Sequence, residues 1–241
     1  MTSGRQALPD RGHGATADGD RVTDDGDVLR RLRTDTAPEH EAVEQALDLM
    51  DAGLTPARLA TVLTRMHGFW GAAETGLEAW AAAEPTAAAG VQWADRRRVH
   101  LFAADLAALG AAPARPADRP DLPAVADTDA ALGRLYVLEG STLGGVFIDR
   151  HLATLPQLAD AGPLRAFSPY GGRTGAMWHD FRSATRAHVA TGGDAGRVVA
   201  AAKQTFTALA AWCGAPVLEQ TGTAAPGPRS SATRRNEVRV P

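Results

Sequence analysis

The segment Leu135–Leu152, "LYVLEGSTLGGVFIDRHL", combines a helical apolar pattern with an unusual density of glycine. Its leucines recur at helical spacing, but Gly140, Gly144 and Gly145 stand inside the pattern. A glycine in a helix interior costs about 1 kcal/mol relative to alanine, and alanine is abundant in this chain. Two interpretations remain open: another backbone packs closely against these positions, or a flat, wide ligand lies on them. A phosphate loop is excluded, because the G-x-x-x-x-G-K pattern is missing.

The rest of the chain also favours helices. Its 241 residues are rich in alanine, leucine and arginine, and only 5% are aromatic, which indicates an all-α protein. A proline-rich connection is expected at 112–123 and a turn at 167–172. The polar ends, 1–26 and 215–241, are predicted to be disordered tails around a single helical domain at 27–214. Helices are expected over 27–50, 55–83, 94–110, 127–155, 174–190 and 194–213.

Composition also excludes several classes of protein. The formal net charge is −3 and no basic stripe occurs, so a nucleic-acid partner is not expected. The single cysteine, Cys213, excludes an intramolecular disulfide and a multi-cysteine metal site. No apolar run approaches the roughly 20 residues that a membrane span needs, and the first residues lack the apolar core of a signal peptide. We therefore expect a cytoplasmic protein with no membrane partner.

The first expected helix contains "LRRLRTDTAPEHEAVEQAL", Leu29–Leu47, with a candidate metal ligand. Thr36 and Glu39 have the spacing of a capping box. His40 follows one turn into the helix, and Glu44 lies at i+4 on the same face. A carboxylate there can accept a hydrogen bond from one imidazole nitrogen and leave the other free for a metal. The alternative is a surface histidine in a charged stretch.

Together these two segments offer an imidazole on one helix and a face without side chains on another, as a haem between them would require. In this arrangement "LRTDTAPEHEAVE" (32–44) resembles the proximal helix of haem oxygenases, and "YVLEGSTLGGVFI" (136–148) resembles their distal helix. The resemblance is closest to the bacterial biliverdin-producing branch that is associated with phytochromes. It extends over 27–213 and includes "GGRTGAMWHDF" (171–181) and "AAKQTFTALAAW" (201–212), which resemble later helices of that branch.

The resemblance implies an all-α, haem-oxygenase-like bundle with haem sandwiched between its proximal and distal helices. It implies that His40 ligates the haem iron, with Glu44 as the carboxylate beside it. Arg33 and Arg182 match cations that bind the haem propionates. Phe206 matches an apolar wall of the haem site.

On the distal helix, the resemblance places Gly140, Gly144 and Gly145 where the backbone approaches the ring and leaves room for dioxygen. Ser141 stands where the mammalian branch has an aspartate that organises water around bound oxygen. Ser141, backbone groups and water are therefore expected to take over that task. We count these four residues as the candidate catalytic group.

Two further groups of residues are weighed against the family pattern. A tyrosine that some members place near a propionate aligns with Leu135, so Tyr136 is expected to point elsewhere. Arg96, Arg97 and Arg98 are interpreted as a solvated helix face. A docking patch for an acidic redox partner is the alternative interpretation of these arginines.

The function that the resemblance implies is oxidative cleavage of haem at a meso carbon to biliverdin, carbon monoxide and iron. The reaction would use dioxygen and electrons from a ferredoxin or reductase, in a monomer or weak dimer, and its biliverdin would be available to a phytochrome. A haem-binding or haem-storage protein of the same fold, without turnover, is the alternative. A non-haem di-iron enzyme is disfavoured, because the chain has no Glu-x-x-His pair.

Overall fold

The computed structural model describes residues 27–115, 118–162 and 164–215. These residues form helices and no strand, which confirms the all-α prediction. The predicted tails, 1–26 and 215–241, lie outside the described residues except for residue 215 and stay a prediction. In chain order the elements are α1 (Val28–Asp35), α2 (Ala37–Leu47), α3 (Pro56–Ala83), α4 (Pro85–Gly90), η1 (Trp93–Arg96), α5 (Val99–Ala108), α6 (Thr128–Leu152), η2 (Pro156–Ala161), η3 (Gly171–Arg173), α7 (Thr174–Ala190) and α8 (Ala195–Gly214).

The first expected helix is in fact two helices, α1 and α2, which meet at Thr36. Thr36 has φ −103° and ψ 3°, and its hydroxyl donates to the carbonyl oxygen of Leu32 at 2.7 Å instead of capping α2. The predicted capping box is therefore wrong. Pro38 explains the break, because it has no N–H to continue the hydrogen-bond ladder of α1. Arg33 and His40 consequently stand on separate helices.

Three other helices begin directly after a side chain that caps them. The side chains of Thr55, Asp127 and Asp194 accept hydrogen bonds from backbone N–H groups of the first turns of α3, α6 and α8. The expected helix at 94–110 is shorter, because the chain forms η1 and becomes extended before α5 begins at Val99. The prediction did not include α4.

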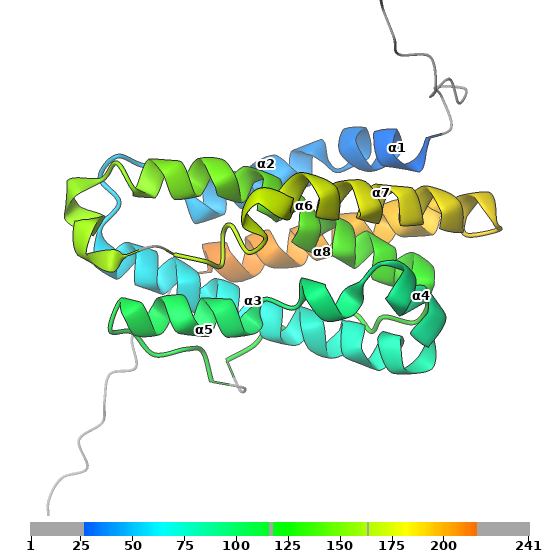
Figure 1. The fold of residues 1–241 in the computed structure, drawn as a ribbon, viewed down its shortest axis with the longest axis horizontal. Helices are drawn as coiled ribbons and strands as arrows, with labels where there is room; N and C mark the ends of the chain where they lie inside the picture. The colour runs from blue at the N-terminus through cyan, green and yellow to red at the C-terminus, as the bar shows by residue number, and fades with distance from the viewer. Residues whose placement is uncertain (1–26, 116–117, 163, 216–241) are drawn as a thin grey trace, which may run out of the picture.

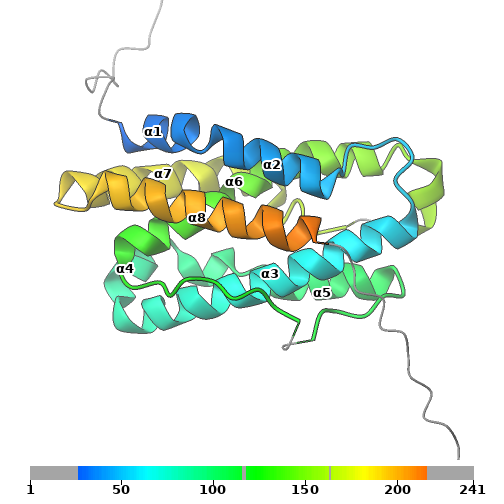
Figure 2. The same cartoon turned by 180° about the vertical axis from the view of Figure 1, so that it is seen from behind.

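Helix α8 is the central element of the bundle, and α6, α2, α1 and α3 all pack against it (Figures 1 and 2). The closest approach to α6 occurs at Gly133. A Cβ atom there would meet the carbonyl oxygen of Val198 and lie 2.6 Å from the Cβ of Ala201. The absence of a side chain at Gly133 therefore lets α6 and α8 cross in close contact.

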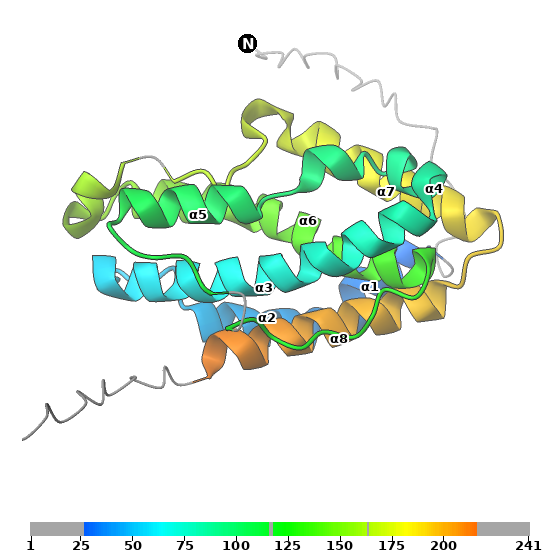
Figure 3. The same ribbon diagram turned by 90° about the horizontal axis from the view of Figure 1, so that it is seen from below.

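A connection after α5 closes the other side of the bundle. Helix α5 lies beside α3, and residues 118–127 run back along α3 to the start of α6 (Figure 3). Gly68 makes room for this segment, because a Cβ there would lie 2.9 Å from the carbonyl oxygen of Asp118. The segment that leads into α6 is thus held against α3.

Replacement of Gly133 by alanine should destabilise the protein, because the new Cβ would overlap the backbone of α8. We expect a loss of about 1–3 kcal/mol, as for other overpacked cores, measured by urea denaturation. Gly175→Ala in α7 is the matched control, because nothing lies within 4 Å of a Cβ at that position. Equal stability of the two variants would contradict the close crossing of α6 and α8.

Candidate functional site

His40 projects from α2 with its side chain 55% exposed. Its Nδ1 atom lies 3.7 Å from Oε1 of Glu44, one turn further along the helix. The edge of the ring meets Phe206 of α8, with the ring centroids 5.6 Å apart. Phe206 is itself buried. One side of the imidazole is therefore held by protein groups, and Nε2 is the nitrogen available to a ligand.

A face of α6 lacks the packing that the rest of the helix has. Gly140 and Gly144 are four residues apart and so lie on one side of the helix. A Cβ atom at either position would meet nothing within 4 Å. Leu143 and Phe147, on the same side, are 37% and 65% exposed. We call these four residues the bare face of α6; its geometry excludes close backbone packing as the reason for Gly140 and Gly144.

Gly145 has a different environment from the other two glycines. A Cβ atom there would overlap the carbonyl oxygen of Phe167 and lie 2.8 Å from its carbonyl carbon. Gly145 is buried, whereas Gly144 is exposed. Of the three candidate catalytic glycines, Gly145 thus serves the packing of α6 against the segment before α7, and the bare face does not include it.

Tyr136 lies close to Arg33 of α1 and to Thr36, the residue between α1 and α2. The expectation was that its side chain points away from the propionate site. Burial raises the pKa of its phenol, while the neighbouring Thr36 hydroxyl and Arg33 guanidinium lower it. Its ring centroid lies 6.4 Å from that of Phe206, which also contacts His40. Tyr136 stands one turn before Gly140 and therefore adjoins the bare face of α6. This residue was missed because the alignment favoured its neighbour in the sequence.

The two predicted propionate cations stand on neighbouring helices, α1 and α7. Arg33 lies close enough to Tyr136 to influence its pKa. Arg182 lies one turn beyond Trp178, whose ring packs 5.9 Å from that of Tyr136. The Nε atom of Arg182 is buried and has no hydrogen-bond partner among the described residues. Arg33 thus lies near the phenol of Tyr136, and Arg182 lies one turn along α7 from Trp178, whose ring packs against Tyr136.

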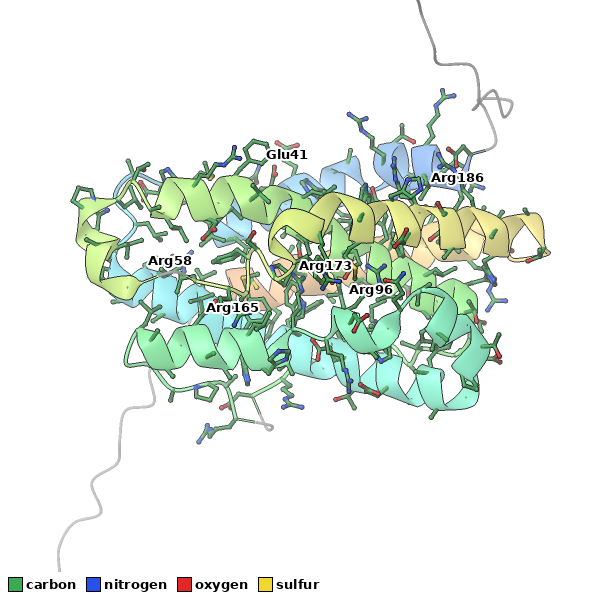
Figure 4. All side chains as sticks on the ribbon, viewed as in Figure 1. Glu41, Arg58, Arg96, Arg165, Arg173 and Arg186 are labelled. Carbon is green, nitrogen blue, oxygen red and sulfur yellow. The ribbon has the colours of Figure 1, made fainter. Side chains whose placement is uncertain are left out.

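The interpretation of Arg96, Arg97 and Arg98 as a solvated face or docking patch is wrong for two of the three. Arg96 is 2% and Arg98 is 1% exposed, whereas Arg97 is exposed and pairs with Glu78 at 3.3 Å. Arg96 points into the centre of the molecule and bonds to the buried carboxylate of Glu139 (Figure 4). Because the chain leaves η1 here and becomes extended, successive side chains point to opposite sides.

Ser141 is held by one of these buried arginines. Its hydroxyl donates to the carbonyl oxygen of Leu138 at 2.7 Å and accepts a hydrogen bond from Nη2 of Arg98 at 2.7 Å. Sequence reasoning missed Arg98, because no sequence pattern distinguishes it from a solvated arginine. Ser141 therefore has an orientation fixed by the protein interior, on the turn that begins the bare face of α6.

The described residues contain no group of three or more histidine, cysteine, aspartate or glutamate side chains that could hold a metal ion. The same part of the chain contains no helix that is long and apolar enough to cross a membrane.

The fold is similar to that of a solved bacterial protein, the haem oxygenase from Neisseria meningitidis, described with NO and CO bound. The TM-score is 0.61 at 22% sequence identity, and the match covers 80% of this chain and 94% of that chain. This similarity confirms a haem-oxygenase-like all-α fold. No family model and no curated protein sequence matches the chain.

The two kinds of glycine environment in α6 predict opposite effects of alanine. Gly140→Ala and Gly144→Ala should leave the unliganded protein as stable as before or stabilise it by up to about 1 kcal/mol, through helix propensity. Gly145→Ala should destabilise it by about 1–3 kcal/mol, because the Cβ would overlap Phe167. Urea denaturation of the three variants without ligand measures this difference. A similar loss in all three would mean that the bare face is packed.

Proposed function

We propose that this protein is a haem oxygenase, which opens haem at a meso carbon and releases biliverdin, carbon monoxide and iron. The observation that carries the proposal is the combination of a half-exposed His40 with a face of α6 on which Gly140 and Gly144 meet only open space. The similarity of the fold to a haem oxygenase supports it. Electrons would come from a ferredoxin or a reductase.

His40 would bind the haem iron through Nε2. The Glu44 carboxylate lies 3.7 Å from Nδ1; moved to hydrogen-bond distance, it would accept the Nδ1 proton's hydrogen bond and leave the Nε2 lone pair for the metal. The edge-on contact with Phe206 restricts rotation of the imidazole. A neutral imidazole, unlike a thiolate, donates little electron density to the iron and does not favour cleavage of the O–O bond.

The bare face of α6 would lie over the other side of the ring. Gly140 and Gly144 allow the ring to approach the helix backbone, and Leu143 and Phe147 lose their exposure to water when the ring covers them. Burial of apolar surface contributes about 25 cal/mol per Å², so this side favours binding without a polar contact. Haem supplies the binding and activation of dioxygen and is also the substrate.

Ser141 would order water at this face and would not itself donate a proton. Its hydrogen is already donated to Leu138, and one of its acceptor sites is taken by Arg98. A hydroxyl has one donor and two acceptor sites, so one acceptor site is left for a water molecule. The propionates would bind Arg33 and Arg182, and the phenol of Tyr136, next to Arg33, is a further hydrogen-bond donor for them.

A haem-storage protein is the second candidate, because it would use the same His40 and the same cations. Only turnover separates the two functions. The choice of the enzyme rests on the glycines of the bare face, because storage alone does not require space for bound oxygen between the ring and the helix. A phytochrome could then use the biliverdin, and this later use does not affect which residues the site needs.

The first prediction from this proposal concerns His40. Purified protein loaded with hemin should show a Soret band, and ferredoxin with its reductase in air should replace that band by a biliverdin band. His40→Ala should abolish this conversion, because the iron loses its ligand. His100→Ala is the control, because His100 is exposed on α5. A wild-type Soret band that persists under reduction and oxygen would favour the storage protein.

The second prediction concerns Arg33. Arg33→Ala should weaken hemin binding by a factor of about 1.4 to 5, the range expected for an exposed ion pair worth about 0.2–1 kcal/mol. Hemin dimethyl ester has no carboxylates, so its affinity should be the same in the variant and the wild type. Absorbance titration measures both affinities, with Arg97→Ala as a control on a different surface. An equal loss of affinity for hemin and its ester would exclude a propionate contact.

A further inference from the structure

Arg98 is a cation held entirely inside the protein. It precedes α5, and its guanidinium lies over the ring of Trp70, 5.0 Å from the ring centroid. Its backbone N–H donates to Oε1 of Glu74 at 2.7 Å. Burial lowers the pKa of its guanidinium, and the charges of Glu139 and neighbouring groups oppose this effect. The position of Arg98 is therefore fixed from α3 at both its backbone and its side chain.

The guanidinium of Arg98 joins two segments that are far apart in the sequence. Its Nη2 donates to the carbonyl oxygen of Leu138 and to Oγ of Ser141, both at 2.7 Å. Its Nη1 donates to the carbonyl oxygen of Ala166 at 3.2 Å. Phe167, the next residue, has the carbonyl group that packs against Gly145. Arg98 thus contacts α6 directly and also holds the segment on which α6 rests.

We propose that Arg98 is a positioning residue. It sets how far the bare face of α6 stands from the haem ring and in which direction the Ser141 hydroxyl points. The proposal rests on the proposed function, because it assigns Arg98 to the oxygen side of the haem. The bare face has no side chains packed over its glycines, and glycine weakens a helix, so the segment needs restraint from its opposite side. The planar, rigid fork of an arginine fixes several acceptors at once, which a lysine ammonium does not do.

A purely structural role would also explain a buried, hydrogen-bonded arginine. In that case Arg98 would stabilise the whole fold without any special effect on α6. The two roles differ in whether Ser141→Ala loosens α6. This variant removes only one hydroxyl and leaves the guanidinium its two carbonyl partners, Leu138 and Ala166. Because Ser141 itself would order water beside the ligand, a change in the ligand's environment follows from either role. Only the positioning role predicts that Ser141→Ala also raises hydrogen–deuterium exchange in 138–147 and that its effect on the ligand is coupled to that of Arg98→Lys.

The first test is hydrogen–deuterium exchange of the full-length protein without haem, read in peptides that cover 138–147. Arg98→Lys should raise exchange in this segment about three- to tenfold relative to the wild type, as expected for loss of a buried hydrogen bond. Peptides of α8 should keep their protection. Arg97→Lys, at the exposed neighbouring position, is the control and should change neither. Equal acceleration over the whole chain would overturn the proposal.

The second test uses the hemin-loaded protein, reduced and bound to carbon monoxide. Arg98→Lys and Ser141→Ala should each shift the C–O stretching band and change the carbon monoxide dissociation rate about threefold or more, by altering a hydrogen-bonded environment, while hemin affinity stays at the wild-type value. The double variant should show less than the sum of the two effects, because both act through one contact.

The outcomes separate the two proposals. Wild-type values of the stretching band and dissociation rate in both variants would overturn the role of Arg98, with the proposed function intact. If Arg98→Lys does not fold, hydrogen–deuterium exchange of Ser141→Ala decides: exchange in 138–147 should rise while α8 keeps its protection, and wild-type exchange in 138–147 would overturn the role of Arg98. A wild-type protein that binds no hemin would overturn the proposed function, and the exchange measurement would still decide whether Arg98 holds α6.

Discussion

The structure depends on one constraint, that nothing packs over Gly140 and Gly144 on one face of α6, so the helix must be held from the opposite face. At Gly140 and Gly144 the helix meets open space, and it gains no packing there. The restraint comes from the opposite side, where Phe167 packs against Gly145 and the guanidinium of Arg98 binds the carbonyl of Leu138. Loss of one partner from such a buried charged network typically costs 3–5 kcal/mol. The bare face of α6 and the buried arginine on the opposite side of the helix are therefore parts of one arrangement.

The parts of this arrangement that depend on local chemistry were predictable from the sequence. The starts of α3 and α6 follow from the capping side chains of Thr55 and Asp127, whose hydrogen bonds involve only the next few residues. His40 and Glu44 share a face because they are one turn apart, and the structure places their side chains together. The helical glycines marked this segment as unusual, and the structure shows two environments in it: Gly145 packs against Phe167, whereas Gly144 meets open space.

The parts that sequence reasoning missed depend on long-range contacts. Arg98 differs from Arg97 only in the side of the chain on which it lies, and contacts with α3 and α6 decide that side. Gly145 differs from its neighbour Gly144 only through Phe167, twenty-two residues away along the chain. Tyr136 was expected to point away from the propionate site, because the family's tyrosine aligned with Leu135. A family alignment is uncertain by one residue, and one residue in a helix changes the direction of a side chain by about 100°.

The central claim is that a haem ring lies between α2 and the bare face of α6 and takes its protein ligand from His40. A crystal structure of the hemin-loaded protein tests this claim most directly. The account predicts an iron–nitrogen bond from Nε2 of His40, with Gly140 and Gly144 against the opposite side of the ring. A ring bound elsewhere, or an iron ligand other than His40, would contradict the account.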